Sequence, residues 1–174
     1  WTQLTPSGSP PYGGPSHAGV YDSARNRMII LGGIMRGNIW GLSLVGAGEW
    51  ARVSDPIGGP FKSSNFSSIY DPVRDQMVVF GGTDVADVWA LSATGEWALL
   101  APAGSPPPPR RGHTAIYDPV RDRMVIFGGF GGVRRNDTWV LSLAGAGVWS
   151  QLTPTGLPPS GRHEHTAVYD PVRD

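Results

Sequence analysis

The chain has 174 residues, and its 14 basic and 14 acidic side chains give a formal net charge of zero. This balance provides no overall field to attract nucleic acid, and no segment reaches the ~20 apolar residues of a membrane span, so we expect neither nucleic acid as a partner nor a membrane-spanning segment. The chain contains no cysteine, which excludes disulfides, thiolate chemistry and cysteine-based zinc sites. Apolar runs broken by 25 glycines and 17 prolines predict an all-β protein with many short strands.

Internal repetition begins at the first residue and continues along the whole chain. Residues 1–4 match the segment that ends each later unit, so we expect them to form a lone fourth strand. Tryptophans recur at residues 1, 50, 97 and 149, and Tyr-Asp pairs begin at residues 21, 70, 117 and 169. A repeat of about 50 residues is typical of the blades of a β-propeller.

The third unit shows the four strands expected in one repeat. His113–Tyr117 is short, β-branched and aromatic, and Asp118–Asp122 then forms a turn. The apolar run Arg123–Phe127, ended by a diglycine, predicts a strand buried on both faces. Residues 139–143 alternate as a partly covered third strand, and residues 148–152 follow a glycine-rich turn as the outermost strand.

Two segments of this unit resemble the kelch motif: the lead-in Arg110–Ala115, and the apolar run into a diglycine at Met124–Gly129, which a spaced tryptophan follows. The resemblance covers essentially the whole chain and implies a kelch-type β-propeller of four-stranded antiparallel blades. We place three complete units and a partial fourth, in an open arc or as part of a closed propeller. Their bounds are residues 1–49, 50–96, 97–148 and 149–174.

The units differ at the lead-in. Unit two has Asn65–Ser68 and no histidine there, and unit one has the weakened Ser16–Gly19, so a role for that histidine is not expected in unit two. We interpret the diglycines as backbone with positive φ or close approach, and the tryptophans as wedge-filling core. A platform of aromatic side chains for sugars is the alternative interpretation of the tryptophans.

Candidate binding residues fall on one face. Strand direction alternates, so the loops between strands two and three and between units share a face, and they are longer and more varied than the other connections. The kelch resemblance implies that partners bind on this face. We expect basic side chains from three loops to converge and pair with an acidic group. They are Arg110, Arg111, Arg134, Arg135, Arg162 and His163. The alternative is a solvated face in which Arg110 or Arg111 is a structural arginine.

The segment His163-Glu164-His165 is a candidate metal site, because alternate residues of a strand share a face. A zinc site needs three or four ligands, and His165 aligns with His17 and His113, so we interpret the repeated histidine as a hydrogen-bonding group. We expect no metal, no cofactor and no catalytic residue. Kelch-type copper oxidases that resemble galactose oxidase need a Tyr–Cys cross-link, which this chain cannot form.

Two classes of function remain open. The first is a non-catalytic scaffold that binds a protein or peptide, of acidic character, through the long loops. The second is a carbohydrate-binding module, or the non-catalytic propeller of a secreted carbohydrate-active enzyme. We also expect the arc of blades to be completed, either within a longer propeller or by homo-oligomer formation between copies of the chain.

Overall fold

The computed structural model describes residues 1–11, 16–32, 39–54, 59 and 64–172, and these contain thirteen strands and no helix. The first sheet contains β2 (His17–Asp22), β3 (Arg27–Gly32), β4 (Ile39–Ser43) and β5 (Glu49–Ser54), with β1 (Ser7–Gly8) at its outer edge. The second contains β6 (Ser67–Asp71), β7 (Gln76–Phe80), β8 (Val88–Ser92) and β9 (Trp97–Leu100). The third contains β10 (Thr114–Asp118), β11 (Arg123–Phe127), β12 (Thr138–Ser142) and β13 (Val148–Leu152).

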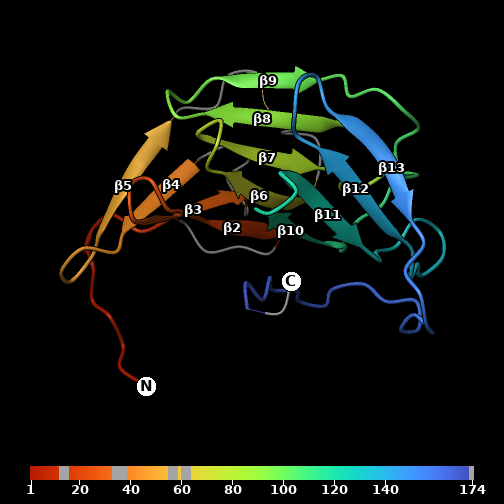
Figure 1. Ribbon diagram of the computed structural model, residues 1–174. Helices are drawn as coiled ribbons and strands as arrows, with labels where there is room; N and C mark the ends of the chain where they lie inside the picture. The colour runs from red at the N-terminus through yellow and green to blue at the C-terminus, as the bar shows by residue number, and fades with distance from the viewer. Residues whose placement is uncertain (12–15, 33–38, 55–58, 60–63, 173–174) are drawn as a thin grey trace.

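Each sheet is an antiparallel meander in which neighbours in sequence are neighbours in space. The first strands β2, β6 and β10 lie side by side at the centre of the arrangement, and β5, β9 and β13 lie at its periphery (Figure 1). These three sheets are propeller blades, which confirms the predicted fold class. None of the described segments forms a helix that could cross a membrane.

The tight turn between the first two strands of a blade follows from its sequence. In blade three the backbone N–H groups of Val120 and Arg121 each donate a hydrogen bond of 3.1 Å to the carboxylate of Asp118. Asp122 then takes a left-handed φ of 46°, a conformation that Asp and Asn tolerate better than most residues. The turn sets the register in which Asp118 pairs with Arg123 and Tyr117 pairs with Met124.

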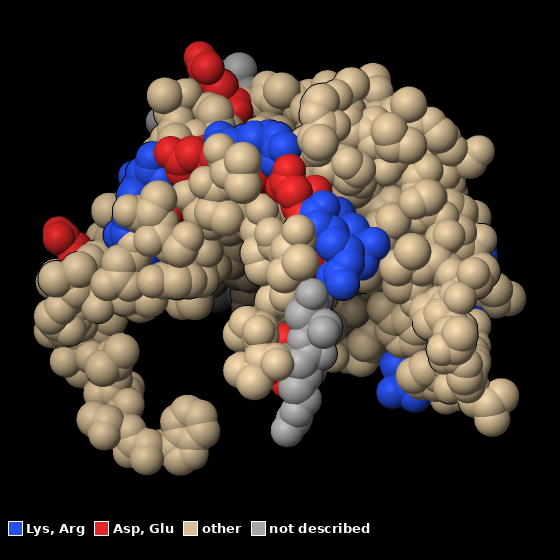
Figure 2. Space-filling model, in the orientation of Figure 1, with Lys and Arg blue, Asp and Glu red and all other residues tan. Residues whose placement is uncertain are grey.

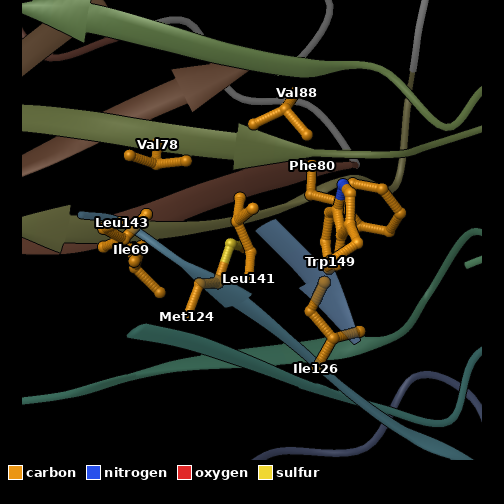
Figure 3. Close-up of a cluster of buried hydrophobic side chains, with 9 residues drawn as sticks. All are labelled: Ile69, Val78, Phe80, Val88, Met124, Ile126, Leu141, Leu143 and Trp149. Atoms are coloured by element: carbon orange, nitrogen blue, oxygen red, sulfur yellow. The ribbon is translucent and has the colours of Figure 1, made fainter. Parts of the chain in front are cut away.

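The main core fills the wedge between blades two and three (Figure 3). Phe80 and Val78 of β7 face Met124 and Ile126 of β11, and all four are fully buried. Trp149 of β13 closes the wedge, with its ring centroid 4.9 Å from that of Phe80. Burial of one such side chain contributes roughly 1.5–3 kcal/mol relative to leaving it in water. The repeated aromatic and apolar positions therefore hold one blade against the next.

Burial of the second strand differs between blades. In β7 all four residues from Met77 to Phe80 are buried, because this blade has a described neighbour on each side. In β11 burial alternates, with Met124 and Ile126 buried and Val125 and Phe127 only half-buried. The burial on both faces predicted for Arg123–Phe127 is therefore found only in part, whereas the equivalent strand of the middle blade is buried on both faces.

Two segments at strand positions of the repeat are irregular: residues 1–4, predicted as a lone fourth strand, and residues 165–169, which are equivalent to His113–Tyr117. Neither segment pairs as a strand in the described structure. Blade strands pair with their neighbours in sequence, and no described segment offers either of these two its expected partner. Instead, Ser7 and Gly8 pair in parallel with Glu49 and Trp50 of β5. This contact between units was not predicted.

Candidate functional site

The connections of each blade lie on two faces. We call the face with the first-to-second and third-to-fourth connections the turn face; its residues are 22–27, 71–76 and 118–123, with the hairpins 43–49, 92–97 and 142–148. We call the opposite side the loop face; its described residues are 81–87, 101–113, 128–137 and 153–165. Backbone hydrogen bonds knit each face together, such as Leu143 N–H to the Asp122 carbonyl (3.1 Å) on the turn face and Gly129 N–H to the Arg162 carbonyl (2.8 Å) on the loop face.

A ladder of ion pairs crosses the turn face. Arg25 of blade one donates two hydrogen bonds, of 2.6 and 2.5 Å, to the carboxylate of Asp75 in blade two. Arg74 of blade two makes the same bidentate pair with Asp122 of blade three, at 3.1 and 2.6 Å. Figure 2 shows the resulting arc of alternating blue and red groups. Each rung joins neighbouring blades at equivalent positions.

Local hydrogen bonds fix the acidic side of the ladder. The hydroxyl of Tyr70 donates to Asp75 (2.6 Å), and that of Tyr117 donates to Asp122 (3.1 Å). Hydrogen bonds from Arg25 and then from Tyr70 hold the pKa of Asp75 well below its ordinary value. Burial, and secondly the hydrogen bond to Asp122, raises the pKa of Tyr117 to about 12. The Tyr-Asp repeat therefore serves contacts between blades as well as the turn.

Arg110 is the one described loop-face arginine that pairs with a carboxylate. Its side chain is fully buried and forms a bidentate pair with Asp137, at 2.7 and 2.9 Å, and a 3.0 Å hydrogen bond to the carbonyl of Gly128. Burial raises the pKa of Asp137, but hydrogen bonds from Arg110 and Trp139 outweigh this and keep it below its ordinary value. Of the two alternatives stated for Arg110, the structural one describes its position.

Arg111, the next residue, lies against the aromatic ring of Phe130. Its backbone exchanges hydrogen bonds of 2.9 and 2.8 Å with Phe130, and its guanidinium carbon lies 5.0 Å from the centroid of the Phe130 ring. The ring of His163 lies 5.7 Å from the same ring. Phe130 therefore brings together two of the predicted binding residues, and it was not itself among the residues predicted. The longer loop after Gly129 was the sequence signal that could have pointed to it.

The remaining predicted residues surround this cluster. Arg134 and Arg162 are exposed, and Arg135 is half-buried. Backbone hydrogen bonds from Arg135 N–H to the Gly129 carbonyl (2.9 Å) and from Arg162 N–H to the Arg135 carbonyl (3.0 Å) hold the loops together. Among the described residues, none of Arg111, Arg134, Arg135 and Arg162 pairs with a carboxylate. Four arginines thus lie on neighbouring loops of this face, and none of them pairs with a carboxylate of the described residues.

His163 and His165 face different neighbours. His165 lies 5.5 Å from the ring of Phe127, and its Nε2 is 3.1 Å from the hydroxyl of Thr114, whereas His163 lies against Phe130. Burial lowers the pKa of His165. In the part of the chain that the structure describes, no three potential ligands are grouped to hold a metal ion.

A further periodic feature lies one residue before His17, His113, His165 and the equivalent Phe66. Ser16, Asn65, Gly112 and Glu164 occupy equivalent places, and all have φ between 57° and 65°. Gly112 N–H donates to the Asn65 carbonyl (2.9 Å), and Glu164 N–H donates to the Gly112 carbonyl (2.7 Å). These two hydrogen bonds join the lead-ins of units two, three and four. The four residues with positive φ share no side-chain type, so a search for repeated residues could not find them.

Comparison with known proteins supports the assignment of the three sheets as blades of a kelch-type propeller. The family model described as the KLHDC2/KLHL20/DRC7 Kelch-repeats domain matches residues 1–172. No curated protein sequence matches the chain. The solved structure of YjhT superposes with a TM-score of 0.66 and 16% identity over 85% of this chain and 53% of YjhT. A copper-bound fungal alcohol oxidase of the AA5 family gives a TM-score of 0.49 and 14% identity over 86% of this chain and 43% of its own. The chain thus spans about half the length of these structures, and the second likeness is too distant to support an argument. By the family match, the repeats and the blades, the chain belongs to the kelch-repeat family.

Proposed function

We propose that the chain is a non-catalytic scaffold that binds an acidic protein segment or peptide on its loop face. The observation that carries the proposal is the contrast in arginine pairing. All five described arginines of the turn face pair with a carboxylate, while four of the five on the loop face do not. Guanidinium groups bind carboxylates bidentately, so unpaired ones suit an acidic partner.

The binding surface consists of Arg111, Arg134, Arg135, Arg162 and His163, with Phe130 at its centre. It lies on loops that the backbone hydrogen bonds above hold in place, which lowers the entropy lost when a partner binds. Arg110 supports this surface from below through Asp137 and the carbonyl of Gly128. A rigid, cationic and partly aromatic surface favours recognition of an acidic segment.

The proposal is tested with labelled degenerate peptides that are acidic, neutral or basic, measured by fluorescence anisotropy beside a soluble glycan array. We expect the acidic peptides to bind, with an affinity that falls as salt concentration rises. Replacing Arg134 and Arg135 with Ala should weaken binding and flatten the salt dependence. Arg121→Ala, on the turn face, is the matched control and should leave both unchanged. Glycan binding without peptide binding would favour the carbohydrate-directed alternative and contradict the proposal.

Self-association of the chain stays a prediction. Blades meet through equivalent ion pairs, such as Arg25 with Asp75 and Arg74 with Asp122, so a second copy would present the same pairing groups. Sedimentation equilibrium over a range of concentrations measures this directly. A mass above 18.5 kDa that rises with concentration is expected, and a constant monomer mass would contradict it.

A further inference from the structure

Phe130 lies at the centre of a short three-stranded arrangement on the loop face. Its backbone forms antiparallel bridges to Arg111 on one side and to Arg134 on the other. Residues directly opposite each other in an antiparallel pair project their side chains from the same face. Arg111, Phe130 and Arg134 therefore form one row, roughly two strand spacings or ~10 Å across, with an arginine on each side of an aromatic ring.

Two side chains are positioned against Phe130 before any partner arrives. The Arg111 guanidinium stacks over Phe130 at 5.0 Å, and His163 lies against the same ring at 5.7 Å. Stacking uses the face of the planar guanidinium and leaves its edge N–H groups available to an acceptor. Arg111 has no carboxylate partner among the described residues, so these donors are not used by an ion pair.

Arg135 carries an unpaired donor next to this row. The Nε atom of Arg135 is buried and has no hydrogen-bond partner among the described groups. A shielded donor without an acceptor is unfavourable, and so is a partly buried charge without a counter-charge. Arg135 Nε lies 3.6 Å from the position that a Cβ on Gly131 would take. Gly131 and Arg135 each follow a residue of the row, so both project to the opposite face, and Arg135 adds positive charge near the row without lining it.

The charge at this surface exceeds what one carboxylate can match. Four arginines contribute four positive charges, and the exposed Glu164 contributes one negative charge, a difference of three. A carboxylate offers two oxygens and one charge, which suits a single guanidinium. A phosphate monoester offers three acceptor oxygens and about −1.5 to −2 charges, which suits two guanidiniums at once.

We infer that the loop face recognises a phosphorylated residue of its peptide partner, with the phosphoryl group bound between Arg111 and Arg134 over Phe130. This inference rests on the proposed function and narrows it. Inorganic phosphate has the same chemistry without the peptide, so the test must separate the two sources.

The test uses degenerate nonapeptides with phosphoserine, glutamate or serine at the centre, measured by fluorescence anisotropy on the whole chain at one ionic strength. We expect the phosphoserine peptides to bind about tenfold or more tightly than the glutamate peptides. Arg111→Lys keeps the charge but loses the planar fork, and should reduce this preference to about threefold or less. Arg121→Lys makes the same change on the turn face and should leave the preference intact. Thermal melts within a few degrees of the unchanged protein show that both variants are folded.

The remaining outcomes separate the inference from the function on which it rests. Equal binding of phosphoserine and glutamate peptides would overturn the inference and leave the acidic-peptide function standing. Absence of binding by either library would overturn both. Inhibition by inorganic phosphate at the same concentration as the phosphopeptide would show that the free anion is the ligand, which overturns the peptide assignment. A preference that survives in Arg111→Lys would also overturn the assigned position.

Discussion

The two faces of this propeller use the same side chain in opposite ways. On the turn face, Arg25 and Arg74 are bidentately paired with acidic residues of the next blade. On the loop face, Arg111 stacks on an aromatic ring and Arg134 is exposed, and neither has a carboxylate partner among the described residues. The difference shows that the balance of 14 basic and 14 acidic residues is not spread evenly. One face uses its arginines in ion pairs, and the other has four arginines without a carboxylate partner among the described residues.

The largest loss of stability is expected for a substitution of Arg110, the one described loop-face arginine that pairs with a carboxylate. Arg110 is a loop-face arginine whose side chain is fully buried against Asp137. Arg110→Ala would leave that carboxylate without its partner, and removing one member of a buried pair costs roughly 3–5 kcal/mol. Chemical denaturation monitored by tryptophan fluorescence measures the change. A loss below about 1 kcal/mol would contradict a structural role for Arg110.

Gly128→Val probes the backbone that supports the loop face. Gly128 has a φ of 67°, and an added Cβ would lie 2.8 Å from the carbonyl oxygen of Arg162 and 3.1 Å from the ring of His165. A β-branched residue in that conformation costs about 3 kcal/mol or more. We expect a much lower melting temperature, with Gly145→Ala as a control, because a Cβ at Gly145 meets nothing within 4 Å although its φ of 62° is also left-handed. Equal losses in the two variants would show that φ, and not contact between blades, is what matters.

Arg74→Gln removes one rung of the ladder and should cost about 1–2 kcal/mol. The ladder also predicts a pH dependence. The folded-state pKa values of Asp75 and Asp122 are lowered, first by hydrogen bonds from Arg25 and Arg74 respectively, so their contribution is present above the unfolded value near 4 and is lost as the pH falls below it. We expect the melting temperature to be steady from pH 8 to 6 and to fall from about pH 5 downward. If the melting temperature of Arg74→Gln fell equally steeply below pH 5, the ladder would not be the source of the pH dependence.

The smallest change in stability is expected at Gln76 of the turn face, which stands where the other two blades have an arginine. Arg27 and Arg123 donate hydrogen bonds of 2.8 Å to the buried Asp22 and Asp118, whereas the equivalent Gln76 donates to Asp71 at 3.1 Å. Gln76→Arg should therefore stabilise blade two by about 0.5–1 kcal/mol, since charged donors form the stronger hydrogen bonds. Differential scanning calorimetry can resolve such a gain. A lower melting temperature would show that the middle blade has no room for the longer side chain.

Sequence patterns predicted the four strands of blade three to within one residue, but not the irregular residues 1–4 or the ion pairs between blades. The bounds expected for Arg123–Phe127 and residues 148–152 are those of β11 and β13, because apolar runs and glycines mark both ends. The rungs of the ladder could not be predicted, since Asp75 and Asp122 are also ordinary turn residues, and their second partner belongs to another blade.

The candidate site was predicted by charge and loop length alone. Arg110 and Arg111 are adjacent in an extended segment, so their side chains leave in opposite directions, and only the packing of Asp137 shows which one is internal. Phe130 was not predicted because one aromatic residue in a glycine-rich loop carries no pattern. Its role follows from the bridges to Arg111 and Arg134, which join segments distant in sequence.

The most direct test of the contrast between the faces is the NMR spectrum of the arginine Nε–Hε groups during titration with the acidic peptides. The contrast between the faces predicts that the signals of Arg111, Arg134, Arg135 and Arg162 shift, while those of Arg25 and Arg74 stay in place at every peptide concentration. Shifts confined to the turn-face arginines, or spread equally over both faces, would contradict it.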